Sequence, residues 1–153
     1  MSDFDFLYGD WTVVNRRLGT LFAGADDWEE FPGTQRAWEL LDGAANVDES
    51  VFPTKGWSGA TFRLFNPETQ LWSIWWASGQ TGTLFPPVTG RFVDGRGDFY
   101  GDDEHDGRPI KAHFIWSHIT PTSARWEQEF SDDGGETWES NWIMELSRVA
   151  PSP

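Results

Sequence analysis

The sequence of 153 residues contains no cysteine. Disulfide bonds, thiolate metal sites and cysteine nucleophiles are therefore excluded, and cysteine usage says nothing about the redox compartment. Long apolar runs are also missing, since no segment approaches the roughly 18 residues of a membrane span. The first seven residues have neither a basic segment nor an apolar core, so we expect no signal peptide and a cytoplasmic protein of bacterial type.

Basic residues are scarce. Lys and Arg number 11 against 25 Asp and Glu, which gives a formal net charge of -14. The basic residues are scattered singly apart from Arg16-Arg17, so the sequence has no basic patch. A chain this acidic repels nucleic acids and anionic membrane surfaces. We expect neither a nucleic acid nor a membrane as a partner.

Aromatic residues are abundant, with 11 Trp and 12 Phe against only 2 Tyr. This content excludes a disordered or low-complexity chain. The length is that of a single domain, which we predict over residues 1–153.

Nearly every segment reads as a strand bounded by Gly, Pro, Asn or Asp, and Asp-Gly pairs predict tight hairpin turns between antiparallel neighbours. We expect only a helical turn near residues 3–8 and a short helix at 25–31, within the longest connection, 19–33. The predicted strands, about ten, comprise residues 11–18, 34–41, 44–52, 59–65, 71–77, 88–93, 97–104, 109–118, 123–130 and 137–148. Their spacing is typical of all-β sandwiches and barrels.

Apolar and polar residues alternate in the last three predicted strands, so one face is buried and the other is solvated. The residues predicted to point inward are Ala112, Phe114, Trp116, Trp126, Gln128, Phe130, Trp142, Met144 and Leu146.

The same alternation, extended to 59–65 and 71–77, predicts that Phe62 and Trp75 point inward and that Arg63 points outward. The outer face of 71–77 is then apolar as well. It predicts either an intramolecular cover or a homodimer contact through Trp72, Ile74 and Trp76.

A short motif, Gly9-Asp10-Trp11, stands at the start of the first predicted strand. It resembles the Gly-x-Trp signature of lipocalins and the wider calycin superfamily, and the longer box from Phe4 to Trp11 resembles uncharacterised bacterial calycin-like families. The resemblance implies a single antiparallel up-and-down β-barrel with a ligand cavity, in which Trp11 packs against Arg148 near the end of the last strand. It brings no known chemistry, and the sequence departs from secreted lipocalins in lacking cysteines and a signal peptide.

A second motif, Ser131-Asp132-Asp133-Gly134-Gly135-Glu136-Thr137-Trp138, resembles the Asp-box hairpin found repeatedly in sialidase propellers. In such a turn the carboxylate caps loop amides and Gly takes a positive φ. One copy cannot build a propeller, so we expect a structural role.

Catalytic chemistry has little support in the sequence. The acidic run 102–106 reads as a solvated hairpin tip, and nucleophile elbows, phosphate loops and dinucleotide fingerprints are absent. An alternative is an enzyme or a haem-binding protein that uses His113 or His118 with a carboxylate, since His118 shares the inward alternation of Trp116. We predict no catalytic residue, metal or cofactor.

The cavity itself is the stronger candidate. We predict a small apolar or aromatic ligand, with an anionic group held by Arg36 or Arg17. The predicted ligand-binding residues are Asn15, Arg17, Arg36, Trp38, Phe62, Trp75, Phe114, Trp116, Trp126, Gln128, Trp142 and Met144. Two alternatives remain open: a barrel filled by Trp side chains, and an interaction module that dimerises.

Overall fold

The computed structural model describes residues 3–149, so the first two and last four residues of the predicted domain lie outside the described range. The elements in chain order are the 3-10 helix η1 (Asp5–Leu7), β1 (Gly9–Leu18), β2 (Trp28–Leu40), the 3-10 helix η2 (Leu41–Gly43), β3 (Ala45–Phe52), β4 (Trp57–Asn66), β5 (Leu71–Ser78), β6 (Thr83–Leu84), β7 (Val88–Val93), β8 (Arg96–His105), β9 (Arg108–Ser117), β10 (Ser123–Ser131) and β11 (Glu139–Arg148). Neither helix of this described part is long and apolar enough to cross a membrane.

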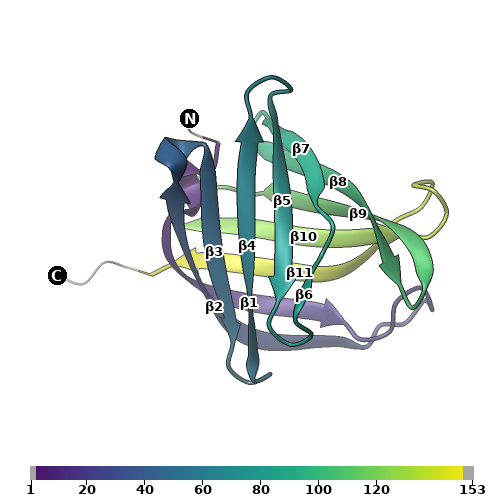
Figure 1. Ribbon diagram of the computed structural model, residues 1–153. Coiled ribbons are helices and arrows are strands. Elements are labelled where there is room, and N and C mark those ends of the chain that lie inside the picture. Colours follow the sequence, from purple (N-terminus) through teal and green to yellow (C-terminus); the bar gives the residue numbers. More distant parts are fainter. Residues whose placement is uncertain (1–2, 150–153) are drawn as a thin grey trace.

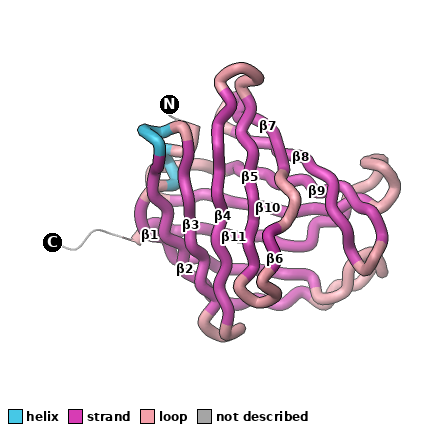
Figure 2. Tube along the Cα trace, in the orientation of Figure 1, coloured by secondary structure: helices cyan, strands magenta, loops and turns pink. Residues whose placement is uncertain are grey.

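Ten strands form a closed antiparallel barrel, which confirms the predicted fold class (Figures 1 and 2). Successive strands are neighbours around the barrel. The ring closes where β1 pairs with β11 and where β5 pairs with β4 on one side and β7 on the other. The two-residue strand β6 pairs with the end of β5.

Each predicted strand is present, with ends that shift by at most two residues, except that β2 begins at Trp28 rather than at residue 34. The predicted helix at 25–31 is wrong, because β2 begins at Trp28 and pairs in register with β1 as far as Leu18. Ladder hydrogen bonds and cross-strand packing outweigh a weak local helical preference.

One end of the barrel is closed by the predicted contact between Trp11 and Arg148, which is confirmed. The Arg148 guanidinium lies 4.2 Å from the centre of the Trp11 ring. It donates to the carbonyls of Tyr8 at 2.6 Å and Phe6 at 2.5 Å, so the last strand is tied to the segment that precedes the first.

Backbone geometry and space explain why residue 9, in the Gly9-Asp10-Trp11 motif, is a glycine. Gly9 adopts a φ of +114°, and a Cβ at this position would lie 2.8 Å from Arg148 Nη1. Any other residue would be strained and would displace the guanidinium.

The segment before β1 plugs the same end. Phe4 is buried and meets Trp72 and Phe92 edge to face at 4.9 and 5.0 Å. Phe6 packs on Trp116 at 5.5 Å. Because aromatic rings occupy this end, access to the interior lies at the opposite end.

The predicted inward residues of β9, β10 and β11 do line the interior, but the alternation is wrong at Asn141, which is buried beside Trp142 because the register with β10 shifts there. For β4 and β5 it is wrong: Arg63, Ile74 and Trp76 point inward, whereas Phe62 and Trp75 lie on the outer surface. A strand that is apolar on both faces carries no signal of orientation. The buried ion pair of Arg63 with Asp48 explains why an arginine can point inward.

Trp72, Ile74 and Trp76 therefore cannot form the predicted dimer contact, because they do not lie on the outer face of β5. Trp72 and Ile74 are 1% and 2% exposed, and Trp76 lines the interior. The outer face of β5 carries Ser73, Trp75 and Ala77 instead.

Candidate functional site

The barrel interior has two adjacent spaces that share aromatic lining residues. The larger is a cavity of about 410 Å³ at the open end, called the mouth cavity below. It is lined by Arg17, Leu18, Gly19, Leu21, Glu29, Ile74, Trp76, Phe85, Pro86, Val88, Asp102, Asp103, Glu104, His105, Ala112, Phe114, Gln128, Phe130, Asn141 and Trp142. Its size is that of pockets that accept small organic ligands.

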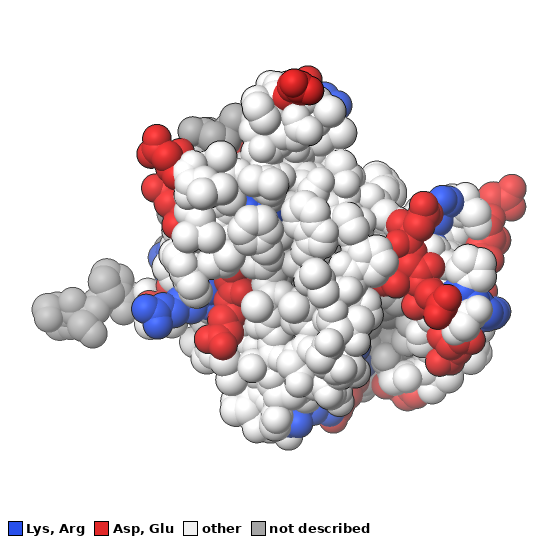
Figure 3. Space-filling view, in the orientation of Figure 1, with Lys and Arg blue, Asp and Glu red and all other residues white. Residues whose placement is uncertain are grey.

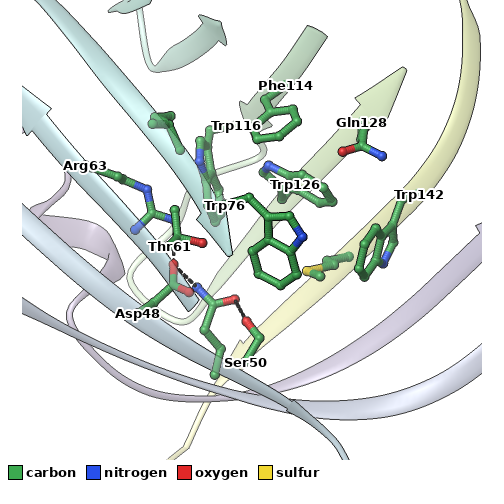
Figure 4. A pocket seen from close by; sticks show the side chains of 13 residues that line it. Asp48, Ser50, Thr61, Arg63, Trp76, Phe114, Trp116, Trp126, Gln128 and Trp142 are labelled. Atoms are coloured by element: carbon green, nitrogen blue, oxygen red, sulfur yellow. Dashed lines mark hydrogen bonds and ion pairs between the residues drawn. The ribbon is translucent and has the colours of Figure 1, made fainter. Parts of the chain in front are cut away.

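The second space, called the inner chamber, lies deeper and measures about 40 Å³. That is room for a few water molecules rather than for a ligand. The prediction of a barrel filled by Trp side chains therefore describes the inner half of the interior. Figure 4 shows these side chains converging on the chamber.

Trp76, Phe114 and Trp142 line both spaces and form the wall between them, and Trp126 joins them on the side of the inner chamber. Trp142 is their centre: Trp76 meets it edge to face at 6.1 Å and Trp126 at 5.7 Å. Phe114 packs against Trp126 at 5.1 Å. This arrangement offers ring faces and edges to a flat apolar ligand.

The positions of the two central indoles have identifiable causes. Gly59 on β4 leaves room for Trp76, since a Cβ there would lie 2.1 Å from the indole. Asn15 is fully buried and accepts a hydrogen bond from Trp142 Nε1 at 3.0 Å, while its own amide donates to the carbonyl of Phe31 at 3.3 Å. Asn15 thus positions the Trp142 indole, and its side-chain oxygen and nitrogen are both engaged in these hydrogen bonds rather than available to a ligand.

Arg17 is the cationic group of the mouth cavity. Its guanidinium lies 4.2 Å from the centre of the Trp142 ring and 6.0 Å from that of Trp57. Burial lowers the pKa of this guanidinium. Within residues 3–149 Arg17 forms no ion pair, so its donors are available to an anion or a carbonyl oxygen.

The opposite wall is acidic. Asp103 and His105, near the end of β8, belong to the inward set of that strand and line the mouth cavity. Burial raises the pKa of the Asp103 carboxyl. The mouth therefore has an acidic side at Asp103 and a cationic group at Arg17, whose neighbour across the strand register, Glu29, is paired with Lys55.

Two amides complete the polar lining. Gln128 donates to Asn141 Oδ1 at 2.8 Å. The Asn141 side-chain nitrogen is buried, and within the part of the chain that the structure describes it has no hydrogen-bond partner. A buried donor without a partner is unfavourable unless water or a ligand accepts from it.

The inner chamber contains a buried charged network. Arg63 pairs with Asp48 at 2.5 Å and donates to Asn46 at 2.9 Å. Gln35 bridges from Asp48 to Ser50 through contacts of 3.4 Å each (Figure 4). This network pairs the polar side chains of β3 and β4 that point into the barrel. The Trp76 and Trp142 indoles lie between it and the mouth cavity.

The connection before β2 folds over the mouth. Leu21 lines the cavity, and the Phe22 amide donates to Glu139 at 2.7 Å. The Phe22 ring lies 6.0 Å from His105 and 5.5 Å from the Arg108 guanidinium. The segment thus bridges β11 and the hairpin of β8 and β9.

The structure brings together eight of the predicted ligand-binding residues on the inner face of the barrel. They are Asn15, Arg17, Phe114, Trp116, Trp126, Gln128, Trp142 and Met144.

The other four lie outside, and their predicted inward orientation is wrong. Trp38 and Phe62 are 45% and 37% exposed, Arg36 stacks against Trp38 at 5.9 Å, and Trp75 packs on Phe62 at 6.0 Å. For Arg36 and Trp38 the reason is that Gln35 and Ala37 occupy the buried positions of β2.

Sequence reasoning missed Trp76, Asp103 and Asn141 as cavity residues. For Trp76 the alternation predicts the wrong face of β5. The alternation of β8, with Gly97 and Phe99 buried, is a signal that places Asp103 inward. The alternation predicts that Asn141 points outward, and it faces the cavity because the register between β10 and β11 shifts at this residue.

The alternative function, an enzyme or a haem-binding protein, depends on where His113 and His118 lie. His113 lies on the outer side of β9, where Nδ1 contacts Glu129 at 2.6 Å, Nε2 contacts Asp98 at 2.8 Å and Tyr100 stacks on the ring at 4.2 Å. Burial disfavours the charged form of Asp98, but hydrogen bonds from Arg96 and His113 outweigh it and lower the pKa of that carboxyl.

His118 is exposed, has a φ of 51° and contacts Ser117 at 2.9 Å. The predicted inward orientation of His118 is wrong, because the strand ends at Ser117. Of the three histidines, His105 is the one that reaches a cavity wall.

The comparisons with known proteins support the architecture. No family model matches the chain, and no curated protein matches its sequence. Among solved structures, the S-type phycobiliprotein lyase CPES from Guillardia theta is similar, with a TM-score of 0.59, 11% identity and coverage of 97% of this chain and 92% of that one. This likeness shows a lipocalin-like barrel fold.

Proposed function

We propose that the protein binds a small, flat, apolar or aromatic ligand in the mouth cavity, with an anionic or carbonyl group of the ligand directed at Arg17. The observation that carries the proposal is the Arg17 guanidinium stacked on Trp142 at the cavity wall, without an ion pair in the described chain. A charge held partly out of water gains most from a bound counter-charge.

The size and the lining support the same class of ligand. A cavity of about 410 Å³ takes a molecule of two or three fused or linked rings. The edges and faces of Trp76, Trp142 and Phe114 provide apolar contact. The free amide of Asn141 offers a donor to an acceptor atom on the ligand.

A matched pair of fluorescent probes tests the proposal. Anilinonaphthalene sulfonate carries an anionic group, and N-phenyl-1-naphthylamine has the same ring system without it. We expect both to bind saturably with quenching of Trp fluorescence, the sulfonate at least tenfold more tightly, since a charge-assisted hydrogen bond contributes about 1.5 to 3 kcal/mol. Biliverdin, a larger planar probe, sets the upper limit of size.

Two results would contradict the proposal. One is the absence of saturable binding by every probe while circular dichroism shows a folded barrel. The other is tighter binding of the neutral probe than of the sulfonate, which would indicate that the acidic side of the mouth dominates over Arg17.

A further inference from the structure

An apolar row crosses the outer surface of four adjacent strands. Trp38 on β2, Val47 on β3, Phe62 on β4 and Trp75 on β5 are partners in the strand register, so their side chains stand beside one another outside the barrel. The rings of Phe62 and Trp75 are 6.0 Å apart. We call this surface the outer row.

The outer row is open to solvent and extends to the rows beside it. Trp38 is 45% exposed and Phe62 37%, and Leu64 and Val51, at neighbouring outward positions, are each 38% exposed. Large contiguous apolar patches are unusual on a monomeric protein and mark a contact surface.

The same face is nearly free of charge. Among the outward residues of the described segments 34–38, 45–51, 58–64 and 73–77, the charged ones are Arg36 and Glu49, and these two are register partners. Figure 3 shows a broad, mostly uncharged face over β4 and β5, whereas carboxylates gather at its edges and elsewhere.

We propose that this face is the interface of a homodimer in which the outer rows of two copies pack on each other. Two chains of net charge -14 repel each other, so copies can approach only through a surface without uncompensated carboxylates. The outer row is such a surface, because the charge of Glu49 is offset by Arg36 directly opposite.

The extent of the face suits this partner. Four strands present a sheet about 20 Å wide, and the eight residues of β3 extend about 27 Å, which gives roughly 500 Å² in projection. Standing side chains raise the accessible area toward the roughly 800 Å² that each partner of a stable complex buries. A two-fold interface uses the same patch on both copies, which an apolar row satisfies without a complementary surface elsewhere.

Sedimentation velocity of the full chain over a range of concentrations tests the proposal. We expect a species of twice the mass of one chain, a shift to monomer in Phe62→Glu with at least a tenfold weaker association, and an unchanged dimer in Val14→Glu. Val14 is the matched control, since it is an apolar residue 46% exposed on the outer face of β1. Thermal unfolding confirms that each variant is folded.

Salt provides a second measurement that does not depend on a variant. Screening weakens the repulsion between acidic copies, so the dimer should strengthen as ionic strength rises. A parent chain that remains monomeric at 100 µM, a dimer that survives Phe62→Glu, or a dimer that dissociates in salt would overturn the proposal. Binding of the monomer to neutral lipid vesicles would assign the face to a membrane instead.

Discussion

The Arg17 guanidinium lies 4.2 Å above the indole of Trp142, and the indole is fixed from below by a hydrogen bond of 3.0 Å to Asn15. Three residues from two adjacent strands thereby hold a cation at the rim of a cavity. The neighbouring Arg16 points to the other side of β1, where it pairs with Glu145 at 3.6 Å. Adjacent arginines therefore have different surroundings and provide a matched comparison.

Replacement of Arg17 by Met is expected to weaken binding of anilinonaphthalene sulfonate at least tenfold and to change binding of the neutral probe less than twofold. The loss follows from one charge-assisted contact. Fluorescence titration measures it, and Arg16→Met is the control, with both affinities retained. Equal loss of the sulfonate in both variants would mean that only the net charge matters.

Replacement of Arg148 by Ala is expected to destabilise the fold by about 1 to 3 kcal/mol, because it removes the cover over Trp11 and three hydrogen bonds to backbone carbonyls. Urea unfolding measures this. Arg16→Ala, which removes a half-exposed ion pair, should change stability by less than about 1 kcal/mol. Similar midpoints for Arg148→Ala and the parent would refute the structural role.

Replacement of Arg63 by Met is expected to destabilise by about 3 to 5 kcal/mol, since Asp48 would keep a buried charge without its partner. The double variant Arg63→Met with Asp48→Leu should recover much of this loss, because no unpaired charge remains. Denaturant unfolding of the three proteins gives the comparison, and a double variant less stable than Arg63→Met would contradict it.

The Asp-box turn gives a prediction on pH. Hydrogen bonds from the Thr137 side chain and amide, and from Ser131, hold the pKa of Asp133 well below its usual range. Because the folded-state pKa is lowered, the stabilising contribution is present above the unfolded value of about 3.9 and is lost as pH falls through the folded value. Asp133→Asn should therefore lower the melting temperature at pH 7, and the difference from the parent should shrink below about pH 4. A constant difference would exclude ionisation as its source.

Replacement of Gly59 by Ala is expected to destabilise by about 1 to 3 kcal/mol and to shift the Trp emission, because the new methyl group would collide with Trp76. Ala60→Ser, on the outward side of the same strand, should leave both unchanged. An unaffected emission spectrum in Gly59→Ala would show that the Trp76 indole can move away from the new methyl group without a change in its environment.

Much of the architecture was predictable because it depends on local signals. Turn residues separate strands, so the predicted strand 88–93 coincides with β7. The alternation in β9 to β11 predicted the inward set apart from Asn141, whereas the contact of Trp11 with Arg148 was implied by the resemblance to lipocalins. The strands and their inward faces need only turn residues and a period of two.

The site was predictable only in part. The sequence determined an acidic, tryptophan-rich, all-β chain, an aromatic interior and the presence of an arginine beside it. The tertiary structure alone decided which arginine: Arg17 lies at the mouth and Arg36 outside, because strand orientation depends on partners distant in sequence. It also turned β5 so that Trp76 rather than Trp75 faces inward, since a strand apolar on both faces takes its orientation from the buried pair of Arg63 and Asp48 and from the space above Gly59.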